Sequence, residues 1–128
     1  MEIDLDSSVL IALANVNDVH YSSCTSKFQS WPHKYHASVL AYTEALFLGF
    51  KESYEVALEA ALELLERIKH VLGVDLDIAN AALVLVSATG MSMIDSLICA
   101  TSQIYGHQLW TCDKGIVAKF PQAKYIGA

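Results

Sequence analysis

The sequence predicts an α/β protein with three layers (α/β/α) around a small central parallel sheet. Short apolar segments typical of buried strands alternate along the chain with longer segments of helical periodicity. Apolar residues make up 54% of the 128 residues and charged residues only 17%, which argues against a disordered chain. This length suits one compact core, and the sequence shows no repeat or linker, so we expect a single domain over residues 1–128.

The first half of the chain is expected to contain two strands and four helices. Apolar and polar side chains alternate over residues 2–6, as in a strand, and Ser7 or Ser8 would cap the helix that follows. Residues 34–37 predict a second strand, and Ser38 would cap the apolar helix after it. The helices are expected over residues 9–14, about 20–31 (ending at Pro32), 39 to about 50, and 54–72.

The second half continues the alternation. Strands are expected over residues 74–76, 108–112 and 123–126. Helices are expected over 78–88, from Ser92 to Tyr105, and in a turn and short helix over 113–119. Asp77 would cap the first of these helices. Ser92 and Asp95 resemble a capping box for the second, which would stop at Gly106.

Charge and cysteine content restrict the possible functions and compartments. The net charge is −6 and Arg67 is the only arginine, so the protein does not bind nucleic acid by basic charge alone. Three cysteines leave no complete set of disulfides, which favours a reducing cytoplasm. The N-terminus lacks the basic region of a signal peptide. Residues 78–94 are uncharged but too short and too interrupted to span a membrane, and we expect two buried helices there.

Glu44 is the most informative acidic residue. It is the only charged residue between His36 and Lys51, and its neighbours at three and four residues along a helix are all apolar: Leu40, Ala41, Phe47 and Leu48. A buried carboxylate is costly unless it is protonated, paired or bound to a metal. The alternative is a side chain that reaches solvent or bonds to a neighbouring hydroxyl.

Three aspartates have ordinary explanations when each is taken alone. Asp6 ends the first strand and could cap a helix, Asp95 lies in the first turn of a helix, and Asp113 could form a turn. Asp4, two residues before Asp6 on the same strand face, is either a rival or a supporting partner. In a parallel α/β sheet, however, Asp6 and Asp113 would end strands at the same edge, where ligands bind.

Together with Glu44, these acids predict a cation site. Two carboxylates about 4 Å apart repel by roughly 4 kcal/mol at an effective dielectric of about 20. A hard divalent ion with oxygen ligands removes this repulsion, and Mg²⁺ or Mn²⁺ suits such a site. The ion would also supply the positive charge that a phosphate needs, which the acidic chain itself lacks.

The motifs that contain these acids resemble the PIN-domain family, and within it the VapC-like toxins of toxin–antitoxin pairs. The resemblance covers nearly the whole chain. Alignment of its start on Val9, Leu10 and Ile11 selects Asp6 in preference to Asp4. The four similar segments are residues 3–14 with Asp6, 38–46 with Glu44, 91–102 with Asp95, and 109–115 with Thr111 and Asp113. Some family members carry a further acid after the position of Asp113, where this chain has Lys114 and Gly115.

The resemblance implies a metal-dependent endoribonuclease, the toxin of a type II toxin–antitoxin pair. The four carboxylates would hold Mg²⁺ or Mn²⁺, and Thr111 would bond a carboxylate or the attacking water. Asp4, Ser7 and Ser8 are candidates for supporting the ligands, and Lys114 for contacting RNA. A cognate antitoxin and a homodimer are the expected partners. The alternatives are an inactive PIN-like interaction module and a receiver-type signalling domain, which would need an acidic pair after the first strand.

Overall fold

The structure, a computed structural model, describes residues 1–30 and 33–128. Within these residues five parallel strands form one sheet in the order β3-β2-β1-β4-β5. The strands are β1 (Glu2–Leu5), β2 (Lys34–Ser38), β3 (His70–Leu72), β4 (Gln108–Thr111) and β5 (Lys124–Tyr125). The helices are α1 (Ser7–Ala14), α2 (Tyr21–Ser30), α3 (Val39–Glu52), α4 (Tyr54–Arg67), α5 (Leu76–Thr89), α6 (Met93–Tyr105) and α7 (Lys114–Lys119).

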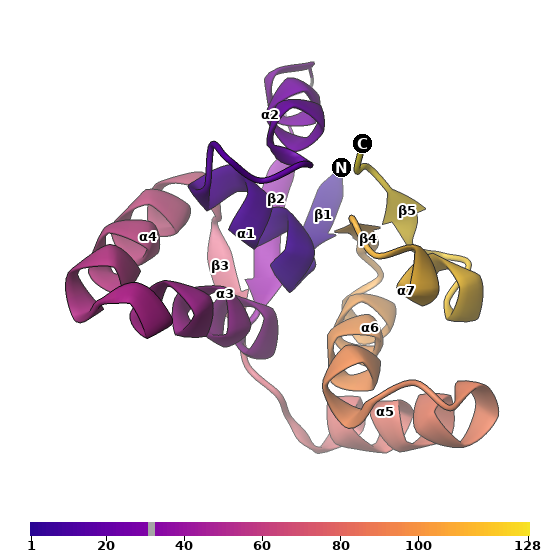
Figure 1. Ribbon diagram of the computed structural model, residues 1–128. Coiled ribbons are helices and arrows are strands. Elements are labelled where there is room, and N and C mark those ends of the chain that lie inside the picture. The colour runs from indigo at the N-terminus through magenta and orange to yellow at the C-terminus, as the bar shows by residue number, and fades with distance from the viewer. Residues whose placement is uncertain (31–32) are drawn as a thin grey trace.

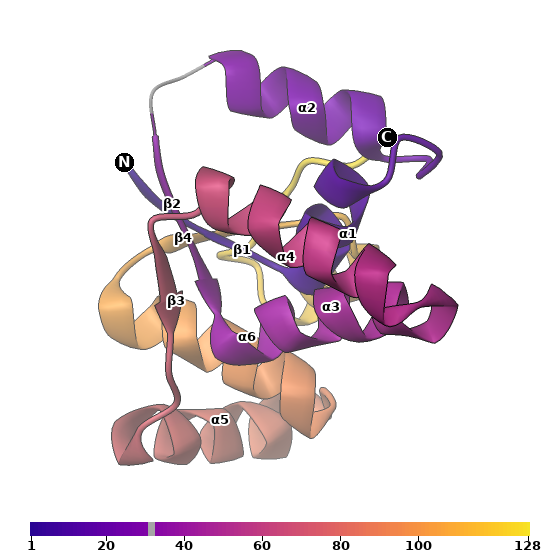
Figure 2. The same cartoon turned by 90° about the vertical axis from the view of Figure 1, so that its left-hand side faces the viewer.

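Helices cover both faces of this sheet, which confirms the three-layer α/β/α fold (Figure 1). Helices α1, α3 and α4 pack together on one face, whereas α5 and α6 form a pair on the other (Figure 2). Ile3 and Leu5 of β1 are fully buried in the main core, next to Val9 and Leu10 of α1. The central strand β1 is therefore the element against which both layers are placed.

Most element boundaries follow from local capping, as predicted. Ser38 accepts a hydrogen bond from the backbone N–H of Leu40 and begins α3. Ser92 accepts one from the N–H of Asp95 at 3.1 Å and begins α6, which ends at Gly106 in the left-handed conformation. Helix α2 begins where expected, but its predicted end at Trp31 and Pro32 lies outside the described residues.

Two predicted elements between residues 54 and 76 are wrong. The helix predicted over 54–72 ends at Arg67, because residues 70–72 instead pair with β2 as strand β3, Val71 lying opposite Ala37. The strand predicted over 74–76 is replaced by the start of α5, since Asp75 and not Asp77 caps this helix by accepting the N–H of Ile78 at 2.9 Å. Strand pairing across the sheet outweighed the helical pattern of the segment.

Residues 78–94 form two helices, as predicted, but these helices are less buried than expected. Ile78 and Ala82 of α5 are buried against α6, whereas Leu83 and Val84 are 62% and 66% exposed. Among residues 1–30 and 33–128, no helix combines the length and apolar character needed to cross a bilayer.

Gly106→Ala is expected to destabilise the protein by about 1 kcal/mol, because φ at this position is +69° and an L side chain is strained there. Urea unfolding followed by circular dichroism measures the effect. Gly73→Ala is the matched control, since a Cβ at Gly73 meets no atom within 4 Å in the described part of the chain and φ is not positive. Equal losses of stability in both variants would contradict this account.

Candidate metal site at the carboxyl edge of the sheet

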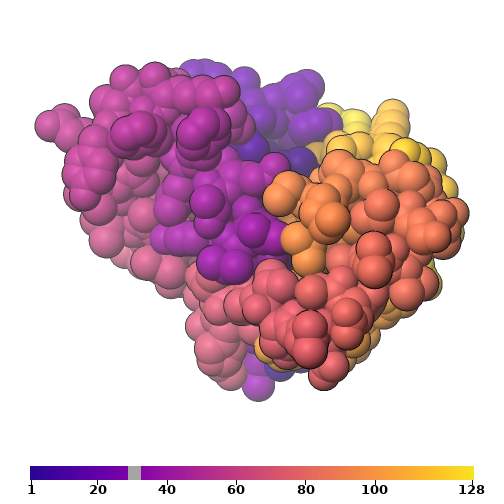
Figure 3. All heavy atoms as spheres, turned by 90° about the horizontal axis from the view of Figure 1, so that it is seen from below, coloured from indigo at the N-terminus to yellow at the C-terminus, as the bar shows by residue number. Residues whose placement is uncertain are grey.

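The predicted acids lie around the carboxyl ends of β1 and β4. These strands are neighbours in the sheet, and the chain leaves them in opposite directions, so a crevice is expected between them. Asp6 follows β1 and Asp113 follows β4, while Asp95 lies in the first turn of α6. Seen from this edge, the indigo atoms of the N-terminal segment are recessed between the magenta surface of α3 and the orange surface of α6 (Figure 3).

Two hydroxyl groups fix the orientation of Asp6. Ser8 and Thr111 donate hydrogen bonds to the same carboxylate oxygen, Asp6 Oδ2, at 2.7 and 2.8 Å. Each hydroxyl oxygen in turn accepts a backbone N–H from the segment after β4, Ser8 from Cys112 at 2.9 Å and Thr111 from Asp113 at 3.0 Å. Hydrogen bonds from the start of α1 and from the end of β4 therefore hold the carboxylate in place.

The second oxygen of Asp6 has an unusual environment. Asp6 is only 2% exposed, and within the described part of the chain its Oδ1 is buried without a hydrogen-bond partner. Asp6 occupies the N-cap position of α1, yet its side chain bonds no helix N–H in that part of the chain. An unpaired buried carboxylate oxygen is costly, and helix capping does not explain this one, whereas a bound cation would satisfy it.

Glu44 reaches the site, but not through the buried face that the sequence predicted. Glu44 itself is exposed, and Phe47 and Leu48 on the same side of α3 are 58% and 44% exposed. The predicted burial of Glu44 is wrong. The residues of α3 that are buried in the protein core are the small residues Ala41 and Ala45. Partial desolvation raises the pKa of Glu44, a hydrogen bond with Ser7 lowers it in part, and Asp6 and Asp95 raise it further.

Asp95 joins the same group of charges. Burial raises its pKa most, the Asp6 carboxylate raises it further, and a hydrogen bond with Ser92 works against these effects. Asp95, Asp113 and Lys119 also line a cavity of about 130 Å³ at the start of α6 and α7. Lys119 was not among the residues predicted to lie at this site. Its position five residues after Lys114 on a short helix gave no signal that it would turn toward the acids.

Asp113 performs the structural role that its sequence position suggested and also borders the site. Its Oδ1 caps α7 by accepting the N–H groups of Gly115 and Ile116 at 2.8 and 3.3 Å. Its charge contributes to the raised pKa of Asp95. Lys114, the candidate RNA contact, is exposed with its ammonium 5.5 Å from the centre of the Tyr125 ring.

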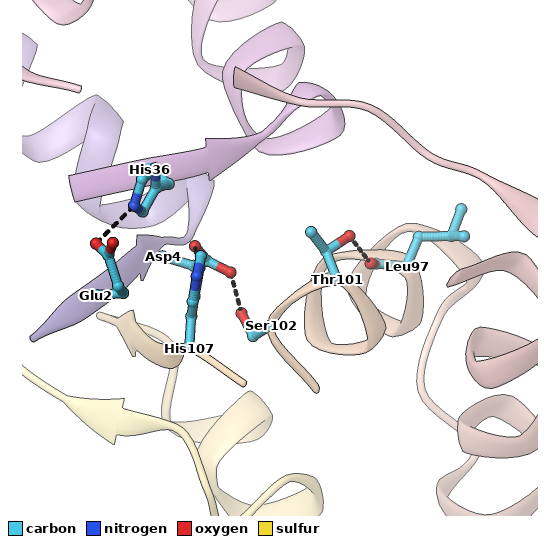
Figure 4. Close-up of polar contacts among 7 residues, drawn as sticks. All are labelled: Glu2, Asp4, His36, Leu97, Thr101, Ser102 and His107. Carbon is cyan, nitrogen blue, oxygen red and sulfur yellow. Dashed lines mark hydrogen bonds and ion pairs between the residues drawn. The ribbon is translucent and has the colours of Figure 1, made fainter. Parts of the chain in front are cut away.

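Asp4, the other predicted supporting residue, belongs to a separate polar cluster. Figure 4 shows its side chain beside Ser102 and His107. Asp4 is 2% exposed and accepts a hydrogen bond from Ser102 at 2.8 Å, and its other oxygen lies 2.8 Å from His107 Nδ1. The ring of His107 stacks on His36, which contacts Glu2 at 2.9 Å. Asp4 therefore stabilises the packing of α6 on the sheet and does not support Asp6.

The acids fit a hydrated divalent ion better than one enclosed by protein ligands. Among residues 1–30 and 33–128, no three acidic, histidine or cysteine side chains converge closely enough to bind one ion. Mg²⁺ usually keeps several waters and takes only one or two carboxylates directly. The Oδ1 atom of Asp6, which has no hydrogen-bond partner in the described part of the chain, can be the direct ligand. Glu44 and Asp95, whose pKa values nearby acids raise, can contact the waters of the ion.

Glu44→Gln is expected to stabilise the metal-free protein slightly at neutral pH, by about 0.3 kcal/mol after allowance for solvent screening. The raised pKa of Glu44 means that its ionised form is disfavoured in the folded state. The penalty is absent below the unfolded pKa of Glu44 near 4.5, where the side chain is protonated in both states. It develops as pH rises from there to the raised pKa of the folded state, and it is complete above that pKa. Thermal unfolding of both proteins at pH 4 and pH 7.5 measures the difference.

Magnesium provides the control for this prediction. Mg²⁺ should raise the Tm of the wild-type protein more than that of Glu44→Gln, because the ion removes a repulsion that the variant lacks. An equal rise in both proteins, or a variant that is less stable than wild type at neutral pH, would show that Glu44 is not under electrostatic strain.

Comparison with known proteins gives the fold a family. The family model of the PIN domain matches residues 3–120. A chain of a toxin–antitoxin complex from Klebsiella pneumoniae superposes with a TM-score of 0.77 at 20% identity, over 95% of this chain and 95% of that one. The sarcin–ricin-loop-cleaving toxin VapC20 of Mycobacterium tuberculosis gives 0.78 at 19% identity, over 92% and 95%.

A chain of the VapBC2 complex from Rickettsia felis, bound to a DNA fragment from its promoter, gives 0.74 at 14% identity over 98% and 97% of the chains. The TM-scores establish a shared fold, and at identities this low the similarity shows the fold alone. Among curated protein sequences no significant match was found. The family-model match extends from β1 to the end of α7 and includes all four acids of the candidate site. The chain therefore belongs to the PIN-domain family.

Proposed function

We propose that this PIN domain is a Mg²⁺- or Mn²⁺-dependent endoribonuclease that hydrolyses phosphodiester bonds in RNA. The observation that carries the proposal is the buried Asp6, held by Ser8 and Thr111, whose Oδ1 has no partner within the described residues. Glu44, Asp95 and Asp113 are the further acids proposed to hold the ion, directly or through its waters. The structurally similar toxin VapC20 is described as cleaving the sarcin–ricin loop, an RNA, which supports this substrate class.

Each side chain has a definite part in this proposal. The bound ion supplies an acidified water and positive charge at the phosphate. Ser8 and Thr111 keep the Asp6 carboxylate in one orientation, and Ser7 is proposed to stabilise the ionised form of Glu44, whose pKa it lowers. Lys119 lines the cavity at the start of α6 and α7 together with Asp95 and Asp113, and there its ammonium can bind a phosphate oxygen.

The net charge of −6 gives the ion a second role. An acidic protein repels the RNA backbone, and the repulsion would be strongest at a cluster of carboxylates. A divalent cation reverses the charge at that point, so substrate binding as well as hydrolysis is expected to depend on it.

Cleavage of end-labelled RNA by the purified protein tests the proposal. Internal cuts are expected with Mg²⁺ or Mn²⁺ and none with excess EDTA, with activity restored when the metal is added back. Metal-independent cutting, or no cutting of any structured or single-stranded RNA, would contradict it and favour an inactive interaction module. Phosphodonor labelling would instead favour a receiver-type domain, and no labelling is expected.

A cognate antitoxin and a second copy of the chain are the proposed partners. Similar folds occur in toxin–antitoxin complexes from Klebsiella pneumoniae and Rickettsia felis, which supports the first. Helices α3 and α4 expose Phe47, Phe50 and Leu62 to 58, 57 and 60%, an apolar surface suited to an antitoxin helix.

Helix α5 exposes a second apolar surface, which includes Leu83 and Val84, and we assign this one to a homodimer. Light scattering of the purified protein and of Leu83→Glu tests the assignment, since only the variant should be monomeric. A cytoplasmic location is part of the proposal and is supported by the free thiols of all three cysteines, each of which lies in the described part of the chain.

A further inference from the structure

Two cysteines that are distant in sequence meet beside the candidate site. Cys24 of α2 and Cys112, the residue after β4, are 88 positions apart, and their sulfur atoms lie 3.3 Å from each other in a hydrogen bond. Cys24 is fully buried and Cys112 is 8% exposed. Two buried thiols held in contact can be oxidised to a single disulfide, which an isolated core cysteine cannot form.

The distance between the two sulfurs is short enough for a bond to form without rearrangement of the fold. A disulfide needs about 2.05 Å between sulfurs, so a closing movement of roughly 1 Å suffices. Side-chain rotation and a small shift of the segment after β4 can supply it, because that segment is a turn between β4 and α7. The hydrogen bond to Cys112 also lowers the pKa of Cys24, which favours the reactive thiolate.

We propose that Cys24 and Cys112 form a redox-sensitive dithiol that hydrogen peroxide converts into an intramolecular disulfide. In this reaction the two thiols are oxidised and the peroxide is reduced. The S–S bond forms, the peroxide O–O bond breaks, and both thiol protons leave in two molecules of water. A dithiol reductant reverses the step. Cytoplasmic disulfides are usually transient and redox-sensing, so the reduced pair is the resting state.

The third cysteine provides an internal reference. Cys99 lies on α6, is fully buried, and its burial raises the pKa to about 12. A thiol with so high a pKa carries almost no thiolate at neutral pH and reacts slowly. Oxidation is therefore expected to be confined to the Cys24–Cys112 pair.

The position of Cys112 links this pair to the proposed nuclease site. Its backbone N–H donates to Ser8 Oγ, and its chain neighbours are Thr111 and Asp113. Movement of Cys112 toward Cys24 would therefore disturb the two hydroxyls that orient Asp6. This link between the disulfide and the site rests on the proposed function. It predicts that the disulfide lowers RNA cleavage by about tenfold or more, as loss of a supporting contact does.

Thiol counting on the full chain tests the disulfide without reference to activity. The reduced protein, freed of reductant and treated with hydrogen peroxide, should fall from three free thiols to one when denatured and titrated. Its mass should drop by two hydrogens, and peptide mapping should join the segments that contain Cys24 and Cys112. Dithiothreitol should restore all three thiols.

Matched variants identify the pair. Cys99→Ser should fall from two thiols to none, whereas Cys24→Ser and Cys112→Ser should form no internal disulfide, and circular dichroism checks that each variant is folded. Three remaining thiols in wild type, a dimer linked by a disulfide, or a link through Cys99 would overturn the proposal. If thiols pair but cleavage is unchanged, the regulatory link is wrong. If neither redox state cleaves RNA, the proposed function fails and the dithiol stands.

Discussion

Asp6→Asn is expected to lower metal-dependent RNA cleavage by at least about 100-fold while leaving the fold intact. An asparagine carbonyl oxygen can still accept the hydrogen bonds that Ser8 and Thr111 donate to Asp6 Oδ2. The buried oxygen Oδ1 would be replaced by an uncharged amide NH2 group. Such a group donates hydrogen bonds and has no lone pair available to bind a cation. Initial rates on labelled RNA at saturating Mg²⁺, with Tm as the check on folding, measure the effect.

Asp4→Asn is the matched control for this variant. It changes the same atoms in an aspartate two residues earlier on the same strand, and both residues are 2% exposed. Because Asp4 bonds Ser102 and His107 and not the site, its conservative variant should keep the cleavage rate of wild type per folded molecule. Equal losses of activity in the two variants would show that Asp6 has no special part in binding the ion.

Asp4→Ala should have the opposite effect, a loss of about 3 kcal/mol in the free energy of unfolding with normal activity in the folded protein. Truncation leaves the Ser102 hydroxyl and the His107 ring without the carboxylate that they contact at 2.8 Å. Both partners are largely buried, so water replaces the lost acceptor poorly. Urea unfolding at neutral pH gives the change in stability.

His107→Ala in the same background distinguishes this account from a general loss of packing. If Asp4 and His107 stabilise each other, the double variant should lose less than the sum of the two single losses. Strict additivity would show that their contact contributes little, and a stable Asp4→Ala variant would show that the cluster is not structural.

The fold could be predicted from local sequence wherever capping residues mark an element. Ser38, Ser92 and Gly106 each act through contacts within four residues, so their positions in the sequence were sufficient. Strand β3 could not be predicted in the same way, because residues 70–72 continue the apolar spacing of α4 and become a strand only by pairing with β2. Such pairing depends on a segment more than thirty residues away.

The sequence predicted which residues would gather at the candidate site better than it predicted their burial and contacts. Motif alignment distinguished Asp6 from Asp4, and the structure places Asp6 beside Thr111 and Asp4 in a different cluster. The expected burial of Glu44 was wrong, because apolar neighbours on a helix do not reveal which of them the core covers. Lys119 and the Cys24–Cys112 pair were missed, since each depends on contacts that exist only in the folded chain.

The hydrogen bonds that hold Asp6 also determine when the site exists during synthesis. Thr111 lies 105 residues after Asp6, and the N–H groups that orient the two hydroxyls come from Cys112 and Asp113. A nascent chain on the ribosome would carry Asp6, Glu44 and Asp95 long before it could assemble them. Strand β4 must leave the exit tunnel and insert beside β1 first, a contact of high sequence separation that forms late. The proposed nuclease would therefore be inert toward the RNA of the ribosome that makes it until β4 has paired with β1.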